Sequence, residues 1–170
     1  GVTDVDAYAA ITNFNRRVVD ETIDLAAAFK LDPGFYYRYL GGEAAMLQTI
    51  KEIKLRSPGS LVIVDGKYGG TALANTGYAE YTFGRLGADA VTVRPVGMRA
   101  LEPFLEAANK GVFVVLWTSD VGSDEVELQE TSTLCGTSDT QPAYIANSFD
   151  VVNRWNINGN CGLVVGAIHL

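Results

Sequence analysis

Lysine and aspartate side chains stand where two expected strands end, and such a pairing of charges could carry proton chemistry. Lys30 ends the first extended segment, and Asp65 and Lys67 follow the apolar run of residues 61–64. In extended backbone residues i and i+2 point the same way, so we expect Asp65 and Lys67 to project together. A carboxylate about 3–5 Å from an ammonium keeps the lysine protonated and fixes its direction. The same Asp-x-Lys triplet is also typical of an ordinary strand-to-helix loop, with the aspartate as a helix cap and the lysine in solvent.

Five extended segments, separated by helical ones, must position these groups. Strands are expected at residues 25–30, 61–65, 89–93, 112–119 and 161–167. A first helix begins at residue 8 and runs into the first strand, and further helices are expected at residues 42–56, 75–86, 99–109 and 142–155.

Strand–helix–strand units of this kind form right-handed crossovers and a parallel sheet. Two architectures fit this α/β pattern, a doubly wound sheet and part of an eight-stranded (β/α)8 barrel. Both bind ligands at the carboxyl ends of their strands, and Thr118 and Ser119 end the fourth strand.

Length and composition narrow the class of protein. The 170 residues, 48% of them apolar and 19% charged, predict one globular domain over residues 1–170. With a net charge of -7, a nucleic-acid partner is not expected. We find no membrane-spanning run and no targeting signal, which predicts a cytoplasmic protein. Cys135 and Cys161 are too few for a disulfide framework, and the lone His169 predicts no metal site.

Short motifs are distributed along nearly the whole chain, and their order carries information as well as their residues. They include residues 14–17, 28–30, 64–69, 78–79, 87–93, 101–104, 111–114, 118–119, 122–123 and 162–167. As a set, these motifs resemble the bacterial-type orotidine 5'-phosphate decarboxylases.

The resemblance implies a (β/α)8 barrel, usually a homodimer, that converts orotidine 5'-monophosphate to UMP and CO2 in pyrimidine biosynthesis without metal or organic cofactor. Lys30, Asp65 and Lys67 match the first three members of the family's Lys-Asp-Lys-Asp array. Lys67 would then protonate C6 as CO2 leaves, and Asp65 would lie beside the carboxylate of the substrate. A preorganised ammonium stabilises such a developing carbanion in a site closed to water.

The resemblance also implies residues that bind the substrate. Ser119, preceded by Thr118, matches a serine that contacts the pyrimidine. Thr76, or alternatively Thr71, matches a threonine that reaches a ribose across the dimer interface. The polar segment 120–141 corresponds by position to a lid over the base, although its composition also suits an ordinary surface loop.

Several positions depart from the family pattern. Gly70 replaces the last aspartate of the array, so two lysines and one aspartate leave a net positive charge. Arg94 replaces an asparagine, and Trp117 replaces an arginine. The first strand of the family and the last two, which hold the phosphate, have no counterpart in the sequence, so about five of eight strands are expected.

Two functions therefore remain open. The retained Lys30, Asp65 and Lys67 favour a decarboxylase represented by its central portion, whereas Gly70 and the missing strands favour an inactive homologue with a structural or interaction role. A small doubly wound binding domain is a third interpretation, but it leaves the ordered motifs unexplained.

Overall fold

A computed structural model describes residues 4–132 and 140–169, and its main feature is a five-stranded sheet. The strands are β1 (Ala28–Leu31), β2 (Leu61–Tyr68), β3 (Ala90–Val93), β4 (Gly111–Trp117) and β7 (Cys161–Val165). All five predicted strands are thus confirmed, with bounds shifted by a few residues. The strand order β1-β2-β3-β4-β7 follows the chain, whereas a doubly wound sheet reverses its order at a switch point. The order therefore favours the barrel interpretation.

Helices connect these strands, and those of eight residues or more were predicted by the periodicity. They are α1 (Asp4–Thr22), α2 (Pro33–Tyr36), α3 (Gly42–Arg56), α4 (Ala72–Ala79), α5 (Met98–Leu105), α6 (Asp124–Glu127) and α7 (Ala143–Asp150). Two π-helical turns, η1 (Glu80–Arg85) and η2 (Val151–Trp155), extend α4 and α7, and a 3-10 turn, η3 (Ala167–His169), follows β7. No described helix is long and apolar enough to cross a membrane.

Two local expectations need correction. The first helix ends at Thr22, short of the strand it was expected to run into, and Leu25 is exposed in the connection. The polar segment 120–141 contains α6 and an antiparallel pair of strands, β5 (Glu130–Ser132) and β6 (Thr140–Pro142). This segment therefore has secondary structure of its own within the described residues.

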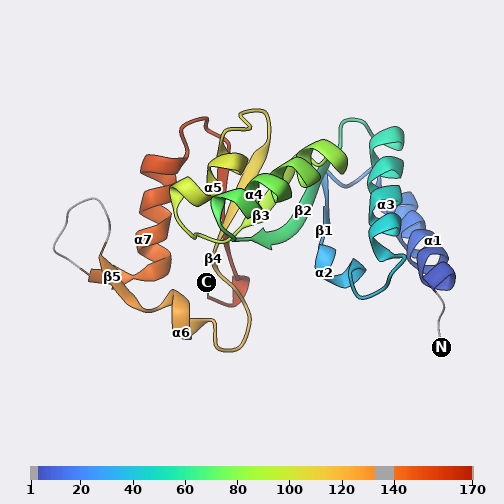
Figure 1. Cartoon of the computed structure of the whole chain (residues 1–170). Coiled ribbons are helices and arrows are strands. Elements are labelled where there is room, and N and C mark those ends of the chain that lie inside the picture. Colours follow the sequence, from blue (N-terminus) through green and yellow to red (C-terminus); the bar gives the residue numbers. More distant parts are fainter. Residues whose placement is uncertain (1–3, 133–139, 170) are drawn as a thin grey trace. The chain divides into compact units, whose positions relative to one another are not determined.

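The described residues form two compact units, of which the first comprises the chain up to Gly66 together with Glu80–Val91. In this unit α3 packs against α1 (Figure 1). The buried face of α3 carries Ala45, Met46, Ile50 and Ile53, spaced as one side of a helix requires. Burying each of the larger side chains contributes about 1.5–3 kcal/mol. β1 and β2 pair in parallel, and Lys30 lies opposite Ile63.

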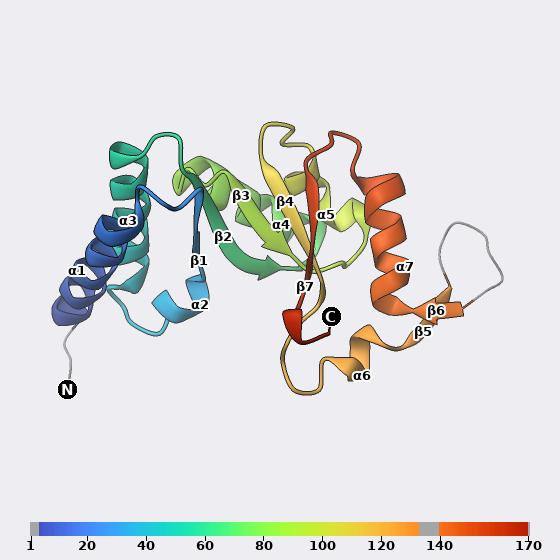
Figure 2. The same cartoon turned by 180° about the vertical axis from the view of Figure 1, so that it is seen from behind.

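The second unit comprises Lys67–Ala79 and the chain from Thr92 onward. β4 and β7 run parallel and side by side within it (Figure 2). Gly162 on β7 lies opposite Phe113 on β4, and a Cβ atom at position 162 would lie 2.7 Å from the phenylalanine ring. Phe113 thus fills the space that a side chain at position 162 would need.

The Cys161 thiol is free and partly buried, and burial raises its pKa. The reduced thiol expected from the sequence is therefore poorly nucleophilic at neutral pH. Cys135 lies outside the described residues.

Candidate active site

An ion pair joins neighbouring residues of β1 and β2 in the first unit. The Lys30 Nζ donates a hydrogen bond to Asp65 Oδ2 over 2.7 Å. The strand register explains why these two side chains lie close together, because Lys30 lies opposite Ile63 and Asp65 is the next residue on the same face of β2. The structure therefore brings two of the three predicted catalytic residues together.

The two charges of this pair have unequal access to water. The Asp65 side chain is 10% exposed, whereas that of Lys30 is 57% exposed. A buried carboxylate is costly unless a partner compensates it. The Lys30 ammonium supplies this compensation and fixes the direction of the carboxylate, while remaining hydrated itself.

Lys30 also lines an aromatic cavity of about 350 Å³ in the first unit, together with Phe35, Tyr36 and Tyr39. This volume lies at the lower end of the roughly 300–1,000 Å³ that is typical of ligand pockets. Asn15 donates hydrogen bonds to the Tyr36 hydroxyl (2.8 Å) and to Thr49 Oγ1 (3.0 Å). Burial raises the pKa of the Tyr36 phenol, which therefore stays neutral beside the lysine at physiological pH.

Lys67, the third predicted catalytic residue, belongs to the second unit and is exposed. Its backbone is left-handed, with a φ of 47°, although the residue lies within β2. Residues i and i+2 point the same way only where the backbone is extended. The spacing of Asp65 and Lys67 therefore does not show that their side chains project together. The Lys67 N–H donates to Thr92 Oγ1 over 2.9 Å.

The predicted substrate-binding residues also lie in the second unit. Thr118 and Ser119 follow β4 directly, and Ser119 is exposed. Thr76 lies on the exposed face of α4, where its hydroxyl donates to the Ala72 carbonyl (3.0 Å). Thr71 stands at the start of α4, and its hydroxyl accepts a long hydrogen bond from the Ala74 N–H (3.4 Å). That arrangement gives Thr71 a helix-capping role.

His169 adds a contact to this strand end that sequence reasoning missed. Its Nε2 lies 2.8 Å from the Thr118 carbonyl oxygen, which also accepts a hydrogen bond from Ser123 Oγ (3.0 Å). The imidazole stacks on Trp117, with ring centroids 3.8 Å apart. Only the pairing of β4 with β7 brings these residues together, and no spacing rule would have found them.

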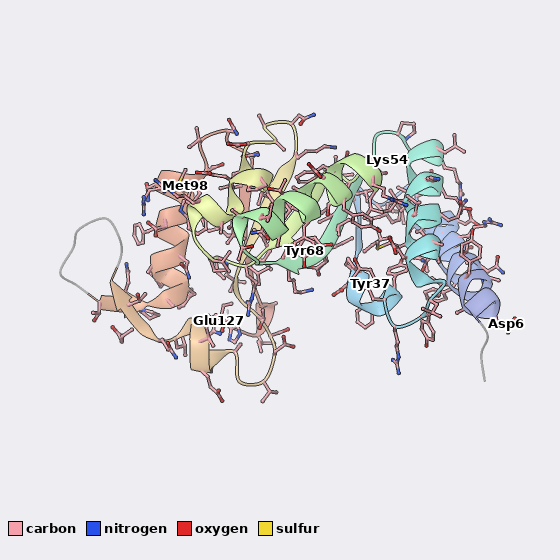
Figure 3. The ribbon with its side chains drawn as sticks, viewed as in Figure 1. Asp6, Tyr37, Lys54, Tyr68, Met98 and Glu127 are labelled. Atoms are coloured by element: carbon pink, nitrogen blue, oxygen red, sulfur yellow. The ribbon has the colours of Figure 1, made fainter. Side chains whose placement is uncertain are left out.

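A second ion pair, between Arg94 and Glu127, was also missed. Arg94 follows β3, and its guanidinium lies 3.1 Å from the Glu127 carboxylate on α6, whose side chain is only 7% exposed. Figure 3 labels Glu127 on α6 and Tyr68 at the end of β2. The Arg94 N–H donates to the Tyr68 carbonyl (2.7 Å), so the arginine is fixed at its backbone as well. Arg94, which departs from the family pattern, thus anchors α6 to the end of β3.

Replacing Arg94 by alanine should destabilise the protein by about 1–3 kcal/mol, because Glu127 would keep a buried charge without this partner. The arginine is partly exposed, which keeps the effect below that of a fully buried pair. Urea denaturation measures the change, and Glu127→Gln in the Arg94→Ala background should recover part of the loss. An Arg94→Ala variant as stable as the wild type would show that the pair contributes nothing in solution.

No protein-family profile matches the chain. It is 38% identical to the orotidine 5'-phosphate decarboxylase of Herpetosiphon aurantiacus over 164 residues, which are 95% of this chain and 58% of that protein. The corresponding protein of Roseiflexus castenholzii is 38% identical over 160 residues, or 94% of this chain and 56% of the relative.

Solved structures show the same relationship. OMP decarboxylase of Leishmania donovani superposes with a TM-score of 0.83 at 33% identity, covering 94% of this chain and 61% of that one. The UMP synthase of the same organism gives a TM-score of 0.82 at 31% identity, covering 98% of this chain and 35% of that one.

The sequential parallel strands and their flanking helices therefore correspond to an incomplete (β/α)8 barrel, as expected. Over nearly its whole length the chain is a homologue of orotidine 5'-phosphate decarboxylases, which confirms the resemblance found in its motifs. The chain spans little more than half the length of the curated relatives that it matches.

Proposed function

We propose that the chain carries the proton-transfer part of a decarboxylase that converts orotidine 5'-monophosphate to UMP and CO2. The observation that carries the proposal is the Lys30–Asp65 ion pair in the carboxyl-terminal halves of two parallel strands, in a homologue of such enzymes. Ligands of parallel α/β folds bind at this end of the strands.

The proposed reaction breaks one carbon–carbon bond and forms one carbon–hydrogen bond. As the bond from C6 to the carboxylate breaks, CO2 departs and the electron pair stays on C6. The Lys67 ammonium gives its proton to C6, and the neutral amine later regains a proton from water. A positioned ammonium stabilises the negative charge that develops at C6.

Asp65 and Lys30 have supporting roles in this proposal. The Asp65 carboxylate lies beside the carboxylate of the bound substrate, and their repulsion is relieved when CO2 leaves. Lys30 fixes the direction of the Asp65 carboxylate through their hydrogen bond. Thr118, Ser119 and Thr76 are proposed contacts to the base and ribose. The homodimer, the single domain and the cytoplasmic location all stay predictions.

The test is a direct assay with the purified protein. After protein and orotidine 5'-monophosphate are mixed, we expect the absorbance of the substrate to fall with time. Chromatography should identify UMP as the product. Absence of turnover above the background rate would overturn the proposal and favour the inactive homologue.

The inactive homologue is kept as a second candidate because of Gly70. No carboxylate can project from this position, and the backbone N–H and carbonyl of Gly70 are both bonded to the Asn75 amide, at 3.0 and 3.1 Å. A catalytic array that lacks its last aspartate would position Lys67 less well.

Restoring an aspartate at position 70 should raise the rate of decarboxylation by about tenfold or more, if the rest of the site is in place. A Cβ atom at position 70 would lie 3.1 Å from Ala74 Cβ, so the change is best made together with Ala74→Gly. Gly70→Asn in the same background is the matched control, because it adds the same bulk without the charge. Equal rates for the two variants would show that a carboxylate at this position has no catalytic role.

A further inference from the structure

The backbone of Lys67 is unusual for its residue type. Among the described residues, Lys67 is the one non-glycine residue with a positive φ. Side chains other than glycine adopt this conformation rarely, and it persists only when the surroundings hold it. The conformation also changes the direction in which the side chain leaves the strand.

A hydroxyl from the neighbouring strand is hydrogen-bonded to the backbone of Lys67. Thr92 Oγ1 accepts the hydrogen bond of the Lys67 N–H at 2.9 Å, and Thr92 is only 3% exposed. Thr92 belongs to β3, whose four residues are all buried, so the acceptor is carried by a rigid element.

The residues that follow Lys67 are fixed as well. Tyr68 stacks on Tyr78 with ring centroids 4.4 Å apart, and its carbonyl accepts the Arg94 N–H. Gly69 lies so close to Arg94 that an added Cβ atom would be 3.0 Å from the arginine Cβ. The strand therefore cannot relax easily on the carboxyl side of Lys67.

We propose that Thr92 is a positioning residue that fixes the left-handed backbone of Lys67 and thereby the direction of its ammonium. The proposal rests on the proposed function, in which Lys67 is the proton donor. Threonine is the one polar residue in the Ala-Val-Thr-Val run of β3. Valine has nearly the same shape and higher apolarity, so packing alone does not call for a hydroxyl there.

The test compares Thr92→Val, which removes the acceptor, with Thr92→Ser, which keeps it. Thr82→Val is a matched control, because Thr82 is fully buried and its hydroxyl has no hydrogen-bond partner. The first measurement is hydrogen exchange of the Lys67 amide by NMR. We expect exchange to be about tenfold faster or more in Thr92→Val, and close to the wild-type rate in Thr92→Ser and Thr82→Val.

The second measurement is steady-state decarboxylation. Thr92→Val should lower kcat by about tenfold to a hundredfold with KM nearly unchanged, because the ammonium is misdirected while substrate still binds. Thr92→Ser should keep kcat close to the wild-type value, because it keeps the hydroxyl. A general loss of packing would lower kcat in Thr92→Ser as well. An unchanged kcat in Thr92→Val would overturn the positioning role.

The two proposals fail in different ways. An inactive wild-type protein would overturn the proposed function, and the amide exchange would still decide whether Thr92 holds Lys67. Exchange at the wild-type rate in Thr92→Val would overturn the inference whether or not the protein is active.

Discussion

Replacing Lys67 by alanine is expected to lower kcat for orotidine 5'-monophosphate by about 10²–10⁴-fold, the contribution of a well-placed general acid. The variant loses both the proton that C6 must receive and the positive charge that stabilises the carbanion. Substrate binding should change less than kcat, and initial rates at several substrate concentrations measure the two effects separately.

Lys67→Arg separates proton transfer from charge. Arginine keeps the positive charge but holds its proton too tightly to donate it, so its rate should exceed that of the alanine variant by the contribution of the charge alone and stay well below the wild-type rate. Lys51→Ala, at an exposed lysine of α3, is the control for the loss of a surface charge. A Lys67→Ala rate within a few-fold of the wild type would remove Lys67 from the mechanism.

Replacing Asp65 by asparagine is expected to have the second largest effect, a fall in kcat of about 10²–10³-fold, by analogy with the loss of one preorganised electrostatic group. Asparagine has the same shape, but it neither repels the substrate carboxylate nor holds the Lys30 ammonium as a charge partner. The fold should persist, because Lys30 is more than half exposed and stays hydrated without the pair.

Asp89→Asn is the matched control for this change. Asp89 also pairs with a lysine, Lys54, and its carboxylate accepts the Val62 N–H at 2.7 Å. Its loss should lower the free energy of unfolding and leave kcat nearly unchanged. If Asp89→Asn and Asp65→Asn lowered kcat equally, the effect would come from general destabilisation, and Asp65 would have no special role.

The periodicity of apolar residues predicted much of the fold, because the burial of apolar side chains determines where helices and strands form. α3 begins and ends at the predicted residues 42 and 56, since its apolar spacing matches one buried helix face and Ser57-Pro58-Gly59 stops it. The four-residue α2 was not predicted, because Asp32-Pro33-Gly34 reads as a turn. In the structure the Asp32 side chain accepts the Gly34 N–H and caps a short helix.

The candidate site was predictable in its residue types and less so in its geometry. Lys30 and Asp65 meet because strand pairing places them on one face, which the sequence pattern implies once the strands are known. The left-handed backbone of Lys67 was not predictable, because a β-branched run favours extended backbone to its end. The Arg94–Glu127 pair joins residues 33 positions apart, and local patterns carry no information about such contacts.

The close approach of Gly162 to the Phe113 ring has a consequence for how this region can vary among relatives. The two positions face each other in adjacent strands, and the aromatic ring occupies the volume beside the glycine. An alanine or valine at position 162 would require a smaller residue at position 113, so the two positions should change together through evolution. Such paired substitution would mark β4 and β7 as neighbours from sequences alone.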